Sequence, residues 1–248
     1  MENLYNDSNI VCIIDSGYSG IGFNQDNIID TYNAIDDTKE VNDDFGHGTS
    51  MLSLLIGYSY ESDVVFGINP KCKVVVIKAI EKDGYAKAKI VAKAIMYASK
   101  YEGSIINISL GTYYNSIDLF KAIEFASSKN CKIVASSGDD SKDYIMYPAS
   151  YENVYAISCQ DKNGERYLYA NDSPKTIYIP GVNIDVLGYN SLTGVWSIEC
   201  NSGSSLSSII FSGLLSLISF DSYQVNYDYL LQCKEEHKII NYNKIMRG

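Results

Sequence analysis

The sequence predicts a single α/β domain in three layers: a mostly parallel, twisted sheet with helices on both faces. Short apolar runs rich in β-branched residues indicate strands that are buried on both sides. Between them lie longer segments with apolar residues three and four positions apart, the period of an amphipathic helix. Strands that alternate with helices along a chain form parallel sheets with right-handed crossovers. Because 46% of the 248 residues are hydrophobic, the chain can bury a large core as one domain over residues 1–248.

These two patterns assign the elements in order. The expected strands are 10–15, 72–80, 104–110, 131–137, 153–158 and 176–181. The expected helices are 86–100 and 116–129, an apolar helix that follows residue 47, and a helix of small residues over 204–218. The small residues of this last helix predict close packing against its neighbours.

Composition limits the partners and the location. Thirty acidic and twenty basic side chains give a net charge of -10, which disfavours nucleic acid and anionic membranes as partners. No apolar run approaches the ~20 residues of a membrane span, and the start MENLYNDSNIVCIID has neither a basic region nor a cleavage site. We therefore expect a cytoplasmic chain without signal peptide or propeptide. Six scattered cysteines favour buried, reduced thiols over disulfides or zinc, and we expect no metal and no cofactor.

Three stretches place reactive side chains at the ends of predicted elements. Asp15 ends the first strand, which leaves its carboxylate at the carboxyl edge of the sheet unless it only caps the next segment. His47 stands between two glycines before an apolar helix, either as a general base or as a structural helix start. The other histidine, His237, is flanked by charges and is expected in solvent. Serines that follow Gly203 begin a helix whose free N–H groups favour developing negative charge, although serines there can also be simple caps.

Four blocks in this order, IIDSG, GHGTS, NISLG and SGSSLS, resemble the signature blocks of the subtilisin-like serine proteases, the subtilases or peptidase S8 family. The resemblance extends from about Ile10 to Ile218. It implies a triad in which Ser205 is the nucleophile, His47 its general base and Asp15 the carboxylate that orients the imidazole. The implied activity is that of a serine endopeptidase on extended peptide or protein substrates, for example in intracellular processing of a precursor.

The resemblance also implies which residues bind the substrate. Residues 109–111 match the edge that binds an extended peptide by strand addition. Residues 136–138 match one wall of the pocket for the side chain before the cut. Met146 falls at the floor of this pocket, where the family often has a small residue, so the pocket should be shallow. The implied substrate-binding residues are Ser109, Leu110, Gly111, Ser136, Ser137, Gly138 and Met146.

The sequence departs from the family at the oxyanion position. The family normally has an asparagine there, whose amide donates to the oxyanion, whereas this chain has Asp139 followed by Asp140. An ionised carboxylate cannot donate. Either Asp139 is held protonated, or the backbone N–H of Ser205 carries the oxyanion alone. Asp139 leaves open the alternative of a weakly active or inactive subtilase-like protein that binds extended peptides, while Asp140 is expected to be a solvated loop acid.

Two further departures lie near the predicted histidine block. Ser50 replaces the second histidine that often follows this block in the family. The loop 57–67 lacks the Asn-rich pattern that holds calcium in many secreted members, so no calcium site is expected there.

Overall fold

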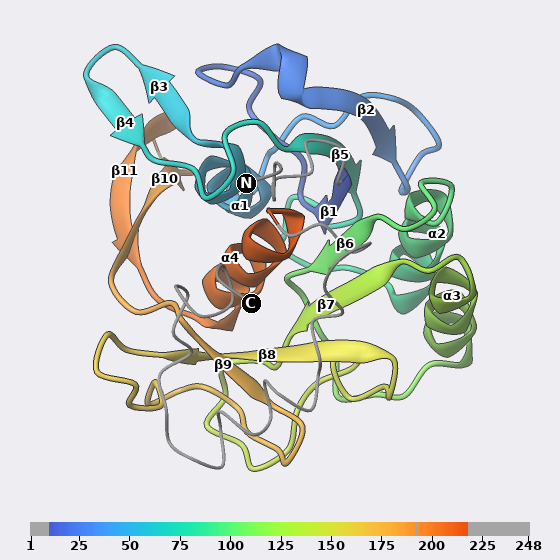
Figure 1. The fold of residues 1–248 in the computed structure, drawn as a ribbon. Coiled ribbons are helices and arrows are strands. Elements are labelled where there is room, and N and C mark those ends of the chain that lie inside the picture. Colours follow the sequence, from blue (N-terminus) through green and yellow to red (C-terminus); the bar gives the residue numbers. More distant parts are fainter. Residues whose placement is uncertain (1–9, 192, 218–248) are drawn as a thin grey trace, which may run out of the picture.

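The computed structural model describes residues 10–191 and 193–217. Its centre is a seven-stranded parallel sheet with the order β2-β5-β1-β6-β7-β8-β9 (Figure 1). The first strand of the described residues, β1, therefore lies inside the sheet, between two later strands. The strands are β1 (Ile10–Asp15), β2 (Ile28–Asn33), β5 (Lys73–Lys78), β6 (Ile105–Ile108), β7 (Lys132–Ser136), β8 (Val154–Gln160) and β9 (Ile177–Pro180).

Helices cover both faces of this sheet and create two cores, as a three-layer fold requires. Successive side chains of β1 point to opposite faces. Val11 and Ile13 join the core beneath α1 and α4, whereas Cys12 and Ile14 join the core beneath α2 and α3. The helices are α1 (His47–Ile56), α2 (Ala88–Ala98), α3 (Ile117–Ser128) and α4 (Ser204–Ser216), with a short 3-10 helix at Gln25–Asn27.

The predicted alternation of strands and helices is confirmed, although most elements are shorter than their apolar patterns. The strand expected over 72–80 ends at Lys78, because the N–H groups of Ala79 and Ile80 both donate to the carbonyl oxygen of Asp15 (2.7 and 3.2 Å). The helix expected over 204–218 ends at Ser216, and residue 218 lies outside the described residues.

Four strands that pair in two antiparallel hairpins were not predicted, and neither was β2. The hairpins are β3 (Tyr58–Tyr60) with β4 (Asp63–Val65), and β10 (Ile184–Asn190) with β11 (Val195–Asn201). Most residues of β11 are exposed or only half-buried, so no apolar run marks the strand. β2 is an edge strand with the same weak signal.

Close packing of the small-residue helix is confirmed. α4 lies at the centre of its face of the sheet (Figure 1). Small side chains allow this approach, and their hydroxyls bond to nearby backbone, as when Ser207 donates to the carbonyl oxygen of Ile179 in β9 (2.9 Å). The buried serines of α4 are Ser204, Ser207, Ser208, Ser212 and Ser216.

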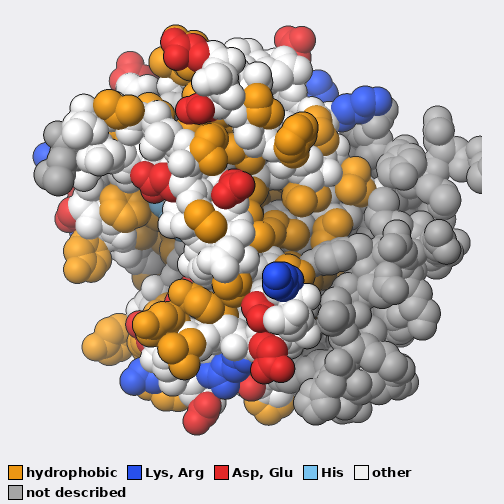
Figure 2. Space-filling view, turned by 90° about the vertical axis from the view of Figure 1, so that its left-hand side faces the viewer, with side chains coloured by type: hydrophobic (Ala, Val, Ile, Leu, Met, Phe, Trp, Pro, Cys, Tyr) orange, Lys and Arg blue, Asp and Glu red, His pale blue; other side chains and the backbone are white. Residues whose placement is uncertain are grey.

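The surface is mixed in character, and one described cysteine departs from the burial expected of these residues. On the face that carries the two hairpins, apolar and acidic side chains intermingle (Figure 2). Five cysteines of the described residues are free thiols, four buried and Cys200 exposed, while Cys233 lies outside the described residues. No helix within residues 10–191 and 193–217 is long and apolar enough to cross a membrane.

Candidate active site

Asp15 is the last residue of β1 and is fully buried. Its Oδ1 accepts hydrogen bonds from the backbone N–H and the hydroxyl of Ser16 (2.8 and 3.3 Å). Gly48 lets the start of α1 approach this strand end, since a Cβ there would lie 2.3 Å from the carbonyl oxygen of Gly17. Because Gly48 has no side chain, the helix start can lie close enough for His47 to contact the Asp15 carboxylate.

His47 and Asp15 form a hydrogen-bonded pair. His47 Nδ1 lies 2.8 and 2.9 Å from the two carboxylate oxygens of Asp15. A carboxylate only accepts, so Nδ1 carries the proton and Nε2 is the acceptor of the ring. Burial by itself lowers the pKa of His47, but the charge of Asp15 and its hydrogen bond outweigh burial, and the pKa is raised above its usual value. The pair has the tautomer and basicity of a general base.

Asp43 holds the start of α1 from the loop before His47. One carboxylate oxygen accepts from the N–H of Gly46 (2.7 Å), and the other accepts from the N–H and hydroxyl of Thr49 (2.9 and 2.6 Å). A buried carboxylate that satisfies free N–H groups caps the helix and fixes its first residue, His47.

Lys78 connects the loop before His47 to the turn after Asp15. Its buried ammonium donates to the carbonyl oxygens of Ser16 and Asn42, each at 2.7 Å. Lys78 pairs with Asp15 in the β1–β5 register, so both charges end strands at one edge of the sheet. Lys78 was not predicted, although a lysine at the end of the apolar run VVVIK was an available signal.

Buried polar contacts hold the start of α4 against β6. Asn107 donates to Ser109 Oγ (2.9 Å) and accepts from the Ser212 hydroxyl (2.9 Å). Ser109 Oγ also lies 2.9 Å from Ser208 Oγ. All four side chains are buried, so these contacts do not compete with water and fix the position of α4.

Ser205 is the second residue of α4 and lies at the same edge of the sheet as the pair. Its hydroxyl donates to the carbonyl oxygen of Ser109 at 3.2 Å. Within the described residues no hydrogen bond joins it to His47. Such loose geometry is common in catalytic sites without substrate, where contacts tighten only in the complex.

The subtilase (peptidase S8) family model matches residues 6–223, which is most of the chain. The chain belongs to the subtilase family. It is 26% identical over 211 residues to the thermophilic serine proteinase of Bacillus sp. (strain AK1), covering 84% of this chain and 51% of that protein. It is 28% identical over 187 residues to the thermostable alkaline protease of Halalkalibacterium halodurans, covering 74% of this chain and 50% of that protein.

Solved structures share the subtilase fold. The nisin leader peptidase of Lactococcus lactis superposes with a TM-score of 0.78 at 19% identity, covering 98% of this chain and 88% of that one. The epidermin leader peptide processing serine protease of Staphylococcus aureus gives 0.75 at 21% identity, covering 93% and 70%. This chain spans about half the length of the two relatives compared by sequence.

In this subtilase, Asp139 binds the start of α4. Its carboxylate oxygens accept from the N–H of Ser204 (2.9 and 3.1 Å) and from the Ser204 hydroxyl (2.8 Å). A helix N-terminus favours an ionised carboxylate in this place. Burial raises the pKa of Asp139, and the hydrogen bonds from Ser204 oppose that rise. While it is ionised, Asp139 accepts hydrogen bonds from Ser204 and has no proton to donate to an oxyanion.

Asn171 fixes the turn that carries Asp139. Its fully buried amide accepts from the N–H of Asp140 (3.1 Å) and donates to the carbonyl oxygen of Ser137 (3.1 Å) and the hydroxyl of Tyr113 (2.9 Å). Asn171 was not predicted from the sequence. These three partners all lie more than thirty residues away in the sequence, so no local pattern marks Asn171.

The predicted substrate-binding residues gather beside the start of α4. The segments 109–111 and 136–138 leave the adjacent parallel strands β6 and β7 at the same edge of the sheet. Met146 lies against the second segment, where its N–H donates to the carbonyl oxygen of Ser137 (3.1 Å). Ser50, at the position of the family's second histidine, donates to the carbonyl oxygen of Leu187 (2.6 Å). His237 lies outside the described residues.

Proposed function

We propose that this subtilase is a serine endopeptidase. The hydrogen bond between His47 and Asp15, beside the helix start that carries Ser205, is the observation that supports the proposal. In the proposed reaction His47 Nε2 takes the proton of the Ser205 hydroxyl as the oxygen attacks, and returns a proton to the leaving amine. Asp15 stabilises the imidazolium, and the backbone N–H of Ser205 at the start of α4 stabilises the oxyanion.

The proposed substrates are peptides or proteins bound in an extended conformation along residues 109–111. Two proteins of the same fold are described as a leader peptidase and a leader peptide processing protease, which supports removal of a leader from a precursor peptide as the reaction. The cytoplasmic location, expected from the sequence, stays a prediction.

A fluorophosphonate probe tests the proposal directly. If His47 activates Ser205, the probe should form a covalent adduct that mass spectrometry of the digested protein places on Ser205. Ser205→Ala and His47→Ala should abolish labelling. An adduct on a different serine of the wild type would show that Ser205 is not the nucleophile.

The second candidate function is binding of extended peptides without efficient cleavage. The Asp139 carboxylate favours it, because an ionised acid at the oxyanion position repels the negative intermediate. The same labelling experiment separates the candidates, since a protein that only binds peptides should leave Ser205 unmodified.

Asp139→Asn should raise kcat at neutral pH if the endopeptidase proposal holds. The asparagine oxygen can still accept the Ser204 N–H, while its amide supplies a donor for the oxyanion. The gain should approach the factor of about 10²–10³ known for this donor in subtilisin, reduced by the backbone donors already present. Initial rates on a peptide that the wild type cleaves measure it.

The pH dependence of this gain reports the protonation of Asp139. Only the neutral carboxyl can donate, so the advantage of asparagine should grow as pH rises through the raised pKa of Asp139 and shrink on the acid side. The ratio of variant to wild-type kcat cancels the titration of His47, which both proteins share. A ratio of one between about pH 5 and pH 9 would show that Asp139 does not act on the oxyanion.

A further inference from the structure

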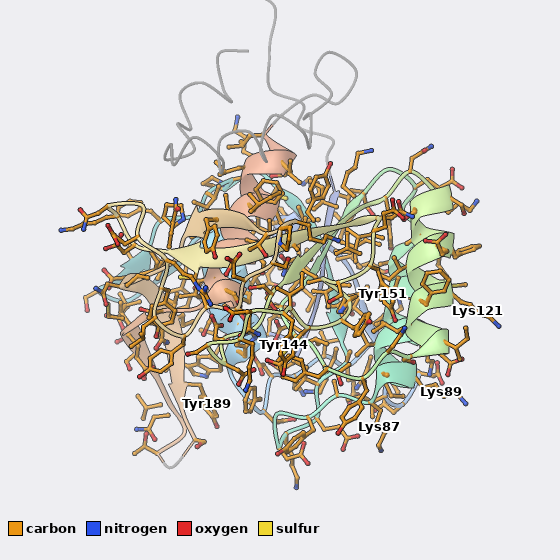
Figure 3. The ribbon with its side chains drawn as sticks, turned by 90° about the horizontal axis from the view of Figure 1, so that it is seen from below. Lys87, Lys89, Lys121, Tyr144, Tyr151 and Tyr189 are labelled. Carbon is orange, nitrogen blue, oxygen red and sulfur yellow. The ribbon has the colours of Figure 1, made fainter. Side chains whose placement is uncertain are left out.

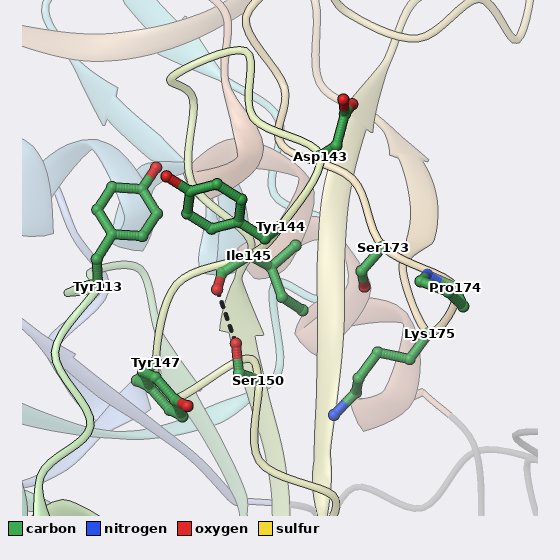
Figure 4. A pocket seen from close by; sticks show the side chains of 9 residues that line it. All are labelled: Tyr113, Asp143, Tyr144, Ile145, Tyr147, Ser150, Ser173, Pro174 and Lys175. Carbon is green, nitrogen blue, oxygen red and sulfur yellow. Dashed lines mark hydrogen bonds between the residues drawn. The ribbon is translucent and has the colours of Figure 1, made fainter.

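A cavity of about 600 Å³ has no part in the proposed reaction (Figure 4). Ile145 and Tyr147 line it, whereas the side chain of Met146 between them faces Gly111 and Gly138. Residues 145–147 therefore separate this cavity from the predicted pocket for the side chain before the cut.

Aromatic and apolar side chains form most of the cavity wall. Tyr113 and Tyr144 lie together at one end, with their rings edge-on and the centroids 5.4 Å apart (Figure 4). Ile145 and Pro174 also line the cavity. Aromatic rings bury a large apolar area and pack edge-on or offset against other rings. The wall therefore suits a small molecule with an aromatic ring.

Hydrogen bonds hold the tyrosine end of the cavity in place. The Tyr113 hydroxyl donates to Asp140 Oδ2 (2.6 Å) and accepts from the buried amide of Asn171 (2.9 Å). Burial and the bond to Asp140 raise the pKa of Tyr113 to about 12, so the hydroxyl keeps its proton at neutral pH. Asp140, expected to be solvated, is exposed but has this defined partner. This end is a fixed aromatic wall.

Lys175 supplies the one cation among the described residues that line the cavity, and it lies away from Tyr113 and Tyr144 (Figure 4). Its ammonium donates to the carbonyl oxygen of Tyr151. Tyr151 is buried, and its N–H donates to the carbonyl oxygen of Pro148 (2.9 Å), so this carbonyl has a fixed position. The amine of Lys175 is thereby held beside the cavity.

Partial burial makes the amine of Lys175 a better nucleophile. Loss of water lowers its pKa to about 8, and the negative charge of the exposed Glu152 partly opposes this effect. At a pH of about 7.5 about a quarter of such amines are neutral, against about one in a thousand at the reference pKa of about 10.4. Only the neutral amine has the lone pair that attacks a carbonyl carbon, as in enzymes that form Schiff bases.

We propose that Lys175 is a covalent modification site for small aromatic aldehydes, which bind in the cavity and form an imine with its amine. Nζ attacks the aldehyde carbon and forms a C–N bond, and the aldehyde oxygen leaves as water with both amine hydrogens. The protonated imine keeps one N–H, which can still donate to the carbonyl oxygen of Tyr151. The inference does not depend on the endopeptidase function, because Asp15, His47 and Ser205 are not among the described residues that line the cavity.

Timed reaction of the full chain with salicylaldehyde tests the proposal. Borohydride added at each time point reduces the imine to a stable amine, and mass spectrometry of the digested protein identifies the modified lysine. Lys89 and Lys121 are exposed and project at the edge of the molecule, so they serve as internal references (Figure 3). We expect Lys175 to react about 10-fold faster than either, because more of its amine is neutral. Equal rates at the three lysines would overturn the proposal.

A second aldehyde tests whether the cavity takes part. Propanal forms the same imine but has no ring to pack against Tyr147 and Ile145. The preference for Lys175 over Lys89 and Lys121 should therefore be smaller with propanal than with salicylaldehyde. The same preference with both aldehydes would show that the cavity binds no aromatic ring, and would contradict the inference.

Three variants identify the reacting group and its control. Lys175→Arg keeps the positive charge and should remove the adduct at this position. Glu152→Gln removes the charge that raises the pKa of Lys175, so this pKa should fall further and the reaction at neutral pH should become several-fold faster. Asp143→Asn is the matched control, since it removes a cavity-lining carboxylate that lies 3.9 Å from Arg166, and it should react like the wild type. No acceleration in Glu152→Gln would overturn the neutral amine as the reacting group.

Fluorophosphonate labelling of the same sample separates failure of this inference from failure of the proposed function. Modification of Lys175 in a protein whose Ser205 stays unlabelled would support the modification site and overturn the endopeptidase. Labelling of Ser205 without preferred modification of Lys175 would do the reverse. The Ser205→Ala variant should form the Lys175 adduct at the wild-type rate.

Discussion

Ser205→Ala and His47→Ala should each lower kcat by about 10⁶, the scale known for the same two residues of subtilisin. Without the Ser205 hydroxyl no acyl enzyme can form. Without the imidazole the hydroxyl keeps its proton at neutral pH and is a poor nucleophile. Because the two side chains act as one unit, the double variant should be no slower than either single variant. Initial rates on a quenched peptide that the wild type cleaves measure all three losses.

A nearby serine outside the triad provides the control. Ser202 lies three residues before Ser205, and its hydroxyl oxygen accepts the N–H of Asn183 (2.9 Å). Ser202→Ala should stay within a few-fold of the wild type. Retention of more than about 1% of kcat in Ser205→Ala or His47→Ala would contradict the proposed roles.

The positions of Asp15, His47 and Ser205 could be predicted from the sequence because each stands at the end of a strongly patterned element, whereas their proposed roles come from the family resemblance. Asp15 ends a continuous apolar run, and His47 and Ser205 begin helices of clear apolar or small-residue composition. In a parallel sheet the carboxyl ends of the strands meet at one edge, and the helices that follow start there. Element ends that are far apart along the chain therefore come together at one place.

The roles of the residues that position the site could not be predicted, because these roles depend on contacts between distant segments. Asn171 joins two loops from a stretch without an apolar pattern, and Lys78 bonds to two carbonyl oxygens that only the folded chain brings together. The hydrogen bond from the Tyr113 hydroxyl to Asp140 is of the same kind, since the turn residues GDDS around Asp140 indicate a loop but not its partner 27 residues earlier. The β10–β11 hairpin was missed because its exposed strands have little apolar surface to mark them.

Asp15→Asn should lower kcat by about 10⁴, the loss known for the equivalent change in a chymotrypsin-like triad. Both oxygens of Asp15 now face Nδ1 of His47 and can only accept its proton. The asparagine amide donates instead, and a donor facing Nδ1 favours the tautomer with its proton on Nε2, which cannot take the serine proton. The variant should therefore fold and bind substrate, with a small change in KM and a large loss in kcat.

The pH profile of Asp15→Asn should shift in a direction that the pKa of His47 fixes. In the wild type burial lowers this pKa, but the charge and hydrogen bond of Asp15 raise it overall, so kcat/KM should begin to fall at a pH above the reference of about 6.5 as acid is added. The variant keeps the burial and loses the opposing charge, so the pKa of His47 should drop and the acid limb should move to lower pH.

Asp43→Asn is the matched control, because it removes a charge that also raises the pKa of His47 but does not contact Nδ1. Asp43→Asn should move the acid limb less and in the same direction, and His47 should keep its proton on Nδ1. An acid limb that stays in place in Asp15→Asn would mean that Asp15 does not set the basicity of His47.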